Sequence, residues 1–177
     1  SREDLVRRVD KALRDLTRHS EELMRRSDET LKELLKHSRR LAKESEDRLK
    51  ELLDEARERG GSEELLKRIK ENVDKNKEEL EKYIRDLERN LKENRERLKK
   101  YEDELREELR RVKRRLEEEE ADERLEEKVR REEEEWKKKD EELKKRSEKN
   151  VDEWRKRDDK LRRDSKRNLD KLREEIR

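Results

Sequence analysis

The sequence predicts an all-α fold, a straight up-down-up bundle of three long helices with little supercoil, and three observations predict it. The chain has 177 residues, of which 64% are charged and 24% are hydrophobic, with no Pro and only two Gly. Such a composition is typical of long helices or of disorder. The few apolar residues recur at helical spacing, and the polar residues between them recur at the same step of 18 residues. This regular placement favours helices over disorder.

A first helix is predicted over residues 2–59. Its leucines repeat every 18 residues, and one such series is Leu5, Leu23 and Leu41. Eighteen residues equal about five turns at 3.6 residues per turn, so the apolar stripe stays on one face without supercoiling. The adjacent glycines Gly60 and Gly61 are the only break of this kind in the chain, and they predict the helix end.

A second helix is predicted over residues 62–118. Ser62 is a good N-cap, and the acidic Glu63 and Glu64 suit the positive end of the helix dipole. The 18-residue repeat continues here, for example in Tyr83 and Tyr101.

A third helix is predicted over residues 122–176, although no glycine precedes it. The apolar stripe that ends at Leu116 restarts at Leu125 two residues out of phase. Two residues correspond to about 200° of rotation, so one continuous helix would present its two stripes on opposite faces. A turn near residues 119–121 with Asp122 as N-cap resolves this. The alternative is an open chain with one long helix, which would act as a coiled-coil interaction or self-assembly module.

Antiparallel packing of neighbouring helices places the polar residues in shared layers. Short loops require antiparallel neighbours. Residue numbers at facing positions then add to 121 for the first pair of helices and to 241 for the second. The predicted layers hold His19, Ser20, Tyr101 and Asp140; His37, Ser38, Tyr83 and Asp158; Ser27, Asn94 and Ser147; Ser45, Asn76 and Ser165; Thr30, Asn90 and Asn150; and Asn72 with Asn168. A buried polar group without a partner costs about 1–3 kcal/mol, so these layers are expected to disfavour wrong registers.

Two tryptophans accompany these layers. Trp136 and Trp154 face leucines at stripe positions and are expected to fill the core. Asp140 and Asp158 follow them by four residues, one turn away on the same face, and are expected to accept the indole N–H.

These features together resemble de novo designed helical bundles with buried hydrogen-bond networks. The resemblance includes the leucine layers, the duplicated polar sets, the Glu/Lys/Arg surface and the Gly60–Glu64 connector. A start at Ser1 rather than Met is expected of a processed chain. The resemblance implies one domain over residues 1–177, high thermal stability, a scaffold function and no catalytic residues.

Two chemical hypotheses for the His-containing layers, a catalytic triad and a metal site, have less support than a structural role. Ser20, His19 and Asp140 contain the residue types of a catalytic triad, but consecutive helix positions point about 100° apart. Backbone N–H groups in mid-helix are already bonded and cannot form an oxyanion hole. Each layer offers only two metal ligands, and His19 and His37 are about 27 Å apart along one helix. We expect no enzyme, no cofactor and no metal.

The charge pattern argues against several partners. The net charge is +2 with both signs interspersed, so no basic stripe indicates a nucleic acid. No apolar run approaches the roughly 18 residues of a membrane span. We expect a monomer that requires no partner. One set of apolar residues flanks the first stripe, either widening contact with a neighbouring helix or supporting weak self-association: Val6, Met24, Leu35, Ala42 and Leu53.

Overall fold

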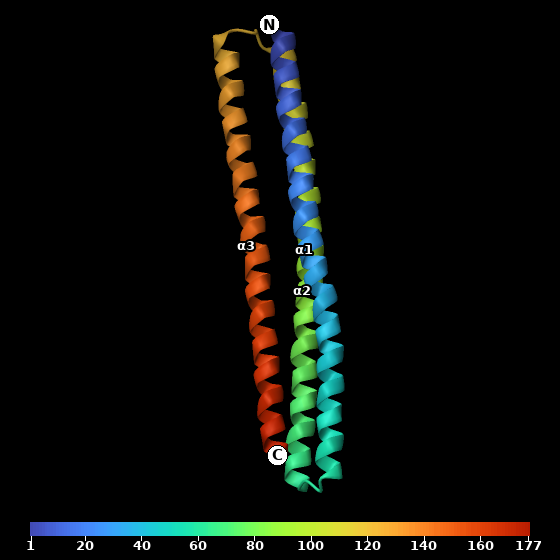
Figure 1. Ribbon diagram of the computed structural model, residues 1–177. Coiled ribbons are helices and arrows are strands. Elements are labelled where there is room, and N and C mark those ends of the chain that lie inside the picture. The colour runs from blue at the N-terminus through green and yellow to red at the C-terminus, as the bar shows by residue number, and fades with distance from the viewer. The chain divides into compact units, whose positions relative to one another are not determined.

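The computed structural model describes residues 1–177 as three helices without strands (Figure 1). Helix α1 spans Arg2–Glu58, α2 spans Glu63–Glu118 and α3 spans Glu123–Ile176. The helices run up, down and up, with α1 packed against both α2 and α3. The prediction of an all-α three-helix bundle is therefore confirmed.

The α1–α2 connection is a glycine C-cap. Gly60 has a φ of +73°, which L side chains rarely adopt. Gly60 N donates to Arg57 O at 3.1 Å, and Gly61 N donates to Ala56 O at 2.9 Å. These two bonds are those of a Schellman motif, which satisfies carbonyls that the helix end leaves open. A Cβ on Gly61 would lie only 3.0 Å from Ala56 O, so this position also favours glycine.

Side-chain caps start all three helices. Ser62 Oγ accepts from Leu65 N at 3.2 Å, and Asp122 Oδ1 accepts from Leu125 N at 3.1 Å. Ser1 Oγ accepts from Asp4 N at 3.4 Å in the same way. Each cap satisfies one of the N–H groups that lack a partner at a helix start.

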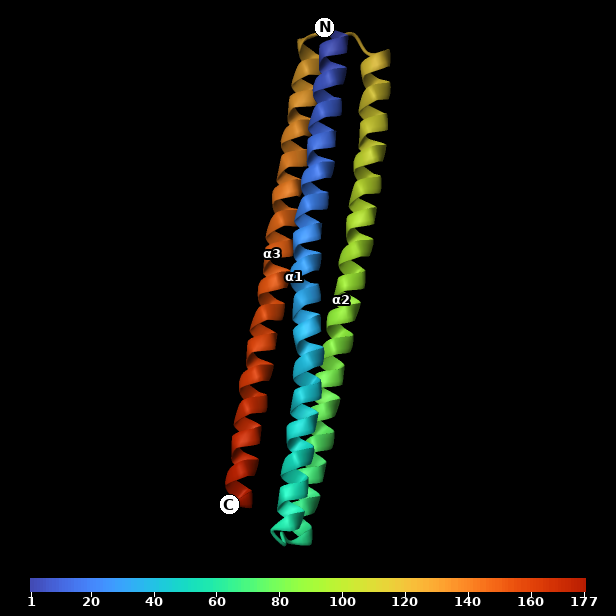
Figure 2. The ribbon, with the colours of Figure 1, turned by 45° about the vertical axis from the view of Figure 1, so that its right-hand side comes forward.

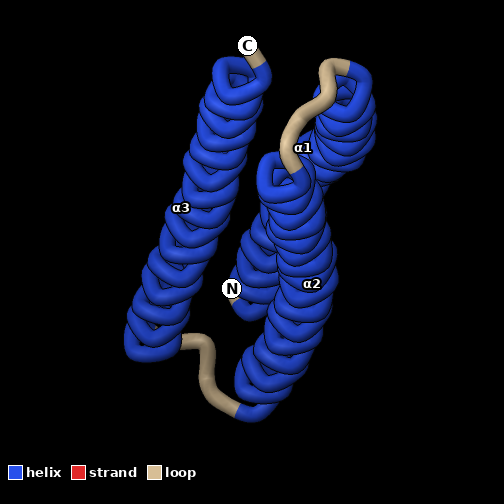
Figure 3. Tube along the Cα trace, turned by 90° about the horizontal axis from the view of Figure 1, so that it is seen from below, coloured by secondary structure: helices blue, strands red, loops and turns tan.

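The chain also turns between α2 and α3, where no glycine is present. Figure 3 shows this loop and the α1–α2 loop in tan between the helices. Arg2 of α1 donates to Glu117 O at 3.3 Å and to Glu119 O at 2.8 Å. Its guanidinium thus satisfies carbonyls at the end of α2, as a glycine cap does at the end of α1. A continuous α2–α3 helix does not form.

The chain divides into two compact units, and each unit contains segments of all three helices. Unit 1 consists of Ser1–Glu29 and Lys92–Asn150, and unit 2 consists of Thr30–Leu91 and Val151–Arg177. The helices can be followed through both units by colour in Figure 2. The two units are described separately below.

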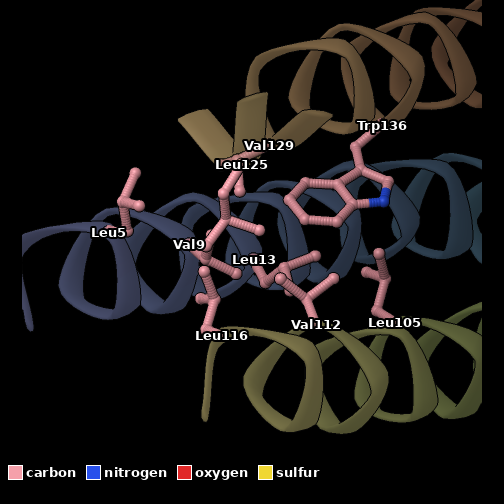
Figure 4. Packing of buried hydrophobic residues seen from close by; sticks show 9 residues of the cluster. All are labelled: Leu5, Val9, Leu13, Leu105, Val112, Leu116, Leu125, Val129 and Trp136. Carbon is pink, nitrogen blue, oxygen red and sulfur yellow. The ribbon is translucent and has the colours of Figure 1, made fainter. Parts of the chain in front are cut away.

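The core of unit 1 takes residues from all three helices (Figure 4). Val9 of α1 and Leu116 of α2 are fully buried, and Val129 of α3 is 2% exposed. The whole cluster consists of Leu5, Val9, Leu13, Leu105, Val112, Leu116, Leu125, Val129 and Trp136. Each buried aliphatic side chain contributes about 1.5–3 kcal/mol, so this thin stripe is the main stabilising element of the unit.

Unit 2 contains two such clusters. The first consists of Leu31, Leu35, Tyr83, Leu87, Leu91 and Val151, and the second of Leu49, Leu52, Ala56, Ile69 and Leu172. Each again combines side chains from α1, α2 and α3. The 18-residue repeat thus places the apolar stripes of all three helices toward one another in both units.

Three of the apolar residues that flank the α1 stripe pack in these clusters, namely Val6, Leu35 and Leu53. Met24 and Leu35 are buried, while Val6, Ala42 and Leu53 are half-buried. No large hydrophobic side chain is exposed anywhere in the chain. Val6, Leu35 and Leu53 thus widen the contact of α1 with its neighbours, while weak self-association stays a prediction.

Candidate functional site: the buried polar layers

The best-connected polar layer lies in unit 2 around Asp158. This carboxylate is 4% exposed. Its Oδ1 lies 3.2 Å from Tyr83 Oη and 3.3 Å from Ser38 Oγ. Its Oδ2 lies 2.9 Å from Nε of Arg162, one turn later on α3. One residue from each helix therefore meets at a single buried carboxylate.

The two serine contacts in this layer differ in strength. Ser38 Oγ also lies 2.6 Å from Leu34 O, closer than its 3.3 Å to Asp158. Because a hydroxyl has one proton, Ser38 donates mainly to the nearer backbone carbonyl. Asp158 thus depends chiefly on Tyr83 and Arg162.

Aromatic and cationic groups surround this layer. The rings of Tyr83 and Trp154 meet edge to face, with centroids 5.7 Å apart and planes at 63°. The Arg157 guanidinium lies 5.2 Å from the Tyr83 centroid and 5.1 Å from that of Trp154. Arg157 also donates to Asp86 of α2 at 2.9 Å. This cation–π arrangement links α2 to α3 on one side of the layer.

His37 does not join the Asp158 layer, although the sequence analysis placed it there. Its side chain is exposed, whereas the neighbouring Ser38 is 1% exposed. In unit 1 the buried Ser20 and the exposed His19 are arranged in the same way, but only His19 reaches its aspartate. Arg162 takes the place predicted for the histidine.

The equivalent layer in unit 1 is less connected. Asp140, 8% exposed, pairs with His19, whose Nδ1 lies 2.8 Å from Oδ2. Ser20 donates to the backbone carbonyl of Thr17 at 2.8 Å rather than to Tyr101 or Asp140. Tyr101 Oη and Asp140 Oδ1 are buried without a hydrogen-bond partner. Of the predicted contacts in this layer, only that between His19 and Asp140 forms.

Burial changes the acidity of both layer tyrosines. Desolvation raises the pKa of Tyr83 to about 12, and the nearby Asp158 charge acts in the same direction. Desolvation likewise raises the pKa of Tyr101 to about 12, and the Asp140 charge adds to it. Both phenols therefore remain donors over the whole neutral range.

An amide pair joins α2 to α3 in unit 2. Asn72 Nδ2 donates to Asn168 Oδ1 at 2.7 Å, and Asn168 Nδ2 donates back to Asn72 Oδ1 at 2.6 Å. Asn76 Nδ2 donates to Ser45 Oγ of α1 at 2.8 Å. Ser165, predicted in the Asn76 layer, is half-buried and takes no part in this bond.

The small polar residues of unit 1 pair differently from the prediction. Ser27 and Ser147 are joined through their hydroxyls, as the layer predicts. Asn94 donates to Asn150 Oδ1 at 3.1 Å, although Asn150 was assigned to the next layer. An asparagine side chain can reach along the helix axis to a partner about one turn away. The layer of Thr30, Asn90 and Asn150 takes residues from both units and stays a prediction.

The tryptophans fill space but do not form the expected indole hydrogen bonds. Trp136 is 4% exposed within the unit 1 core, and Trp154 is half-buried against the Leu31 cluster. Asp140 and Asp158 bond to His19 and Arg162 instead of to the indole groups.

The geometry of these layers bears directly on their chemistry. Ser20 Oγ is hydrogen-bonded to the backbone, so His19 and Asp140 do not form a triad with it. No group of three or more His, Cys, Asp or Glu side chains is gathered as metal ligands. None of the three helices has a segment apolar enough to span a bilayer.

Comparisons of the chain with protein-family models, with curated proteins and with solved structures find no match. Its function is therefore inferred from its own residues and contacts.

Proposed function

We propose that the chain is a structural scaffold without catalytic activity, in which buried polar contacts specify how its helices pair. The repeated layers and the resemblance to designed bundles both support this. The observation that carries the proposal is the Asp158 layer, where a buried carboxylate meets Ser38 of α1 and Tyr83 of α2.

The polar layers are expected to make helix pairing more specific rather than to make the fold more stable. A satisfied hydrogen bond contributes only about 1 kcal/mol net, while a buried donor or acceptor left alone costs about 1–3 kcal/mol. Leucine layers tolerate sliding, rotation and exchange of helices between chains. A layer with Tyr83 and Asp158 penalises each of these changes, because it separates donor from acceptor.

The test replaces the whole layer with apolar side chains. The variant Ser38→Ala/Tyr83→Phe/Asp158→Leu removes the three buried polar side chains together and leaves Arg162, which is about half exposed, to water. Its free energy of unfolding should therefore stay within about 1–2 kcal/mol of the parent. Its helix pairing should become less specific. Light scattering should then reveal oligomers, and the amide NMR spectrum should show more than one signal per residue.

A matched control replaces side chains in an apolar layer instead of a polar one. Leu31→Ile/Leu87→Ile keeps volume and polarity, and should remain monomeric with one set of signals. The proposal fails if the apolar triple variant gives the same single species as the parent. It also fails if that variant loses more than about 4 kcal/mol, because the layer would then be chiefly a stability element.

The alternative, an open-chain coiled-coil module that self-assembles, predicts a different result. In that case the parent chain itself would be oligomeric, and the triple variant would lower the mass by weakening the interface.

A further inference from the structure

A groove of about 300 Å³ lies between α2 and α3 in unit 1, and Met24 of α1 also lines it. Met24 is 7% exposed, while Leu143 and Tyr101 in the lining are half-buried. The Tyr101 hydroxyl is itself buried, so this residue offers carbon surface to the groove. The volume is at the lower end of the range of small-molecule sites, which combine apolar walls with a few polar groups.

Three cationic side chains line this groove, Arg97 and Lys100 from α2 and Arg146 from α3. All three are exposed, and none of them forms an ion pair or a hydrogen bond. Glu104 is the only acidic side chain in the lining. The positive charges at this groove are therefore open to solvent and largely without neutralising partners.

One uncharged donor accompanies these cations. Asn94 Nδ2 donates to Asn150 Oδ1 at 3.1 Å, and Asn150 Nδ2 forms no hydrogen bond. The buried polar atoms without a partner do not include Asn150 Nδ2, so this group is open to solvent. Because α2 and α3 are antiparallel, Arg97 and Arg146 both lie about one turn from this amide pair in the same direction. An exposed amide donor and two guanidinium groups therefore line one short stretch of the groove.

The chain contains the same groove with the opposite charge in unit 2. That groove has a volume of about 220 Å³ and also lies between α2 and α3. Four of its lining residues repeat those of unit 1 at a step of 18, namely Asn76, Leu161, Ser165 and Asn168. The repeat replaces Arg97 by Glu79 and Arg146 by Asp164, and Lys75 is the only cation in this lining. The two grooves thus share most of their uncharged lining and differ in the sign of their charge.

We propose that the unit 1 groove binds a small organic dianion, namely a phosphate monoester that carries one aromatic ring. The phosphate accepts from Arg97, Arg146 and Asn150, and the ring lies against Leu143. Guanidinium groups bond phosphate oxygens in pairs, whereas a lysine such as Lys100 adds a point charge. Three cations against one carboxylate in the lining favour a dianion over a monoanion. This binding role goes beyond the scaffold role and is independent of it.

Phenyl phosphate titrated into the full chain tests the proposal, with the side-chain amide signals of Asn150 and Asn168 as the readout. At about pH 7.5 the probe is mainly a dianion, since the second pKa of a phosphate monoester is about 6. The Asn150 signals should shift, as should the methyl signal of Met24, the only methionine, while the Asn168 signals stay in place. A ligand of this size is expected to have a Kd on the order of 1 mM.

Two analogues separate the parts of the probe. Phenol lacks the charged group and should bind at least about tenfold more weakly than phenyl phosphate. Inorganic phosphate lacks the ring that lies against Leu143 and should also bind more weakly.

Variants that exchange charges between the two grooves assign the contact. Arg97→Glu/Arg146→Asp gives unit 1 the residues of unit 2 and should weaken binding more than about tenfold. Glu79→Arg/Asp164→Arg should create a second site, so that the Asn168 signals also shift. All four side chains are exposed and without an ion pair, so the fold should be kept, and amide spectra check this.

A matched control reverses two charges outside the groove. Arg110 and Arg124 are exposed residues of unit 1 that form no ion pair and do not line the groove. Arg110→Glu/Arg124→Asp changes the net charge by the same amount and should leave the Kd within about twofold of the parent. This control separates the local contact from the effect of overall charge.

The proposal is overturned if phenol or inorganic phosphate shifts the Asn150 signals as strongly as phenyl phosphate does. It is also overturned if Arg97→Glu/Arg146→Asp binds phenyl phosphate like the parent, or if the control variant weakens binding equally. A third contradicting result is that about 10 mM phenyl phosphate leaves the Asn150 and Met24 signals in place.

Discussion

The two aspartate layers use the same residue types at the same spacing but form different contacts. In unit 2, Asp158 contacts Tyr83, Ser38 and Arg162. In unit 1, Asp140 contacts only His19, and the Tyr101 hydroxyl has no partner. The core residues of the two layers are identical, so their surroundings produce the difference. Arg162 and Arg157 of unit 2 correspond to Lys144 and Lys139 of unit 1.

This difference shows that a repeated polar set does not guarantee a repeated set of hydrogen bonds. A guanidinium has five N–H donors in a planar fork, whereas an ammonium is a compact and strongly hydrated charge. In unit 2, Arg162 pairs with the buried carboxylate of Asp158, and Arg157 covers the rings of Tyr83 and Trp154. A lysine at the same place more readily stays in water.

High pH should affect both layers at once. Tyr83 and Tyr101 have pKa values of about 12 in the folded chain, against 10.0 for an ordinary tyrosine. The unfolded chain therefore releases these protons at lower pH than the folded chain does. Their contribution to stability should be complete below pH 10 and should be lost as the pH rises from 10 to about 12.

Tyrosinate absorbance and chemical unfolding across this pH range check the prediction. Tyr83→Phe and Tyr101→Phe should each remove one of the two late-titrating groups. Ionisation of both phenols near pH 10 in the folded chain would contradict the desolvation account.

Replacing each aspartate with leucine should separate the two layers. Asp158→Leu leaves the buried Tyr83 hydroxyl without its acceptor and should cost about 1–3 kcal/mol. Asp140→Leu removes a carboxylate with one unpaired oxygen and should be neutral or slightly stabilising. Guanidinium unfolding followed by circular dichroism measures both, and equal losses would mean that the two layers are equivalent.

Removing the two tyrosine hydroxyls should change the free energy of unfolding less than the aspartate replacements do, and in opposite directions in the two layers. Tyr83→Phe loses a hydrogen bond to Asp158 and should cost about 1 kcal/mol. Tyr101→Phe removes a hydroxyl that has no partner, so unfolding should need the same concentration of guanidinium or more. A clear loss of stability in Tyr101→Phe would show that its hydroxyl is bonded in solution.

Exchanging the basic residues should produce the smallest change. Lys144→Arg gives Asp140 the neighbour that Asp158 has, and should add about 0.2–1 kcal/mol, the usual size for a partly exposed ion pair. Arg162→Lys should lose a similar amount in unit 2. Thermal unfolding at low and high salt tests this, because the added stability should fall as salt screens the pair.

Much of the fold could be predicted because a few residues decide it. Gly60 and Gly61 end α1, and Ser62 and Asp122 cap the next two helices. The 18-residue step also set the register correctly for several contacts. Asn76 with Ser45 and Tyr83 with Asp158 both lie in the layers predicted for them.

The arginine contacts could not be predicted with the same ease. Lys and Arg make up 58 of the 177 residues, so no single one stands out in the sequence. Arg162 does carry a signal, because it follows Asp158 by one helical turn. The bonds from Arg2 to the end of α2 depend on which residues meet at a helix end, which only the fold reveals.

The histidines show the limit of register arguments. Position along a helix determines which residues are level with one another, but rotation about the axis decides which of them point inward. His19 reaches Asp140 from the edge of its layer, while His37 stays in solvent. Both histidines are exposed beside a buried serine, and Asp158 pairs with Arg162 instead of with His37.

We propose that one chain encloses its own polar layers. Light scattering on the parent chain, over a range of dilute concentrations, tests this most directly. A constant mass of 22.2 kDa is the predicted result, because α1, α2 and α3 of one molecule then supply all the residues of each layer. A mass of about twice that value, rising with concentration, would contradict the account. The layers would then lie between chains, and the molecule would be a self-assembly module.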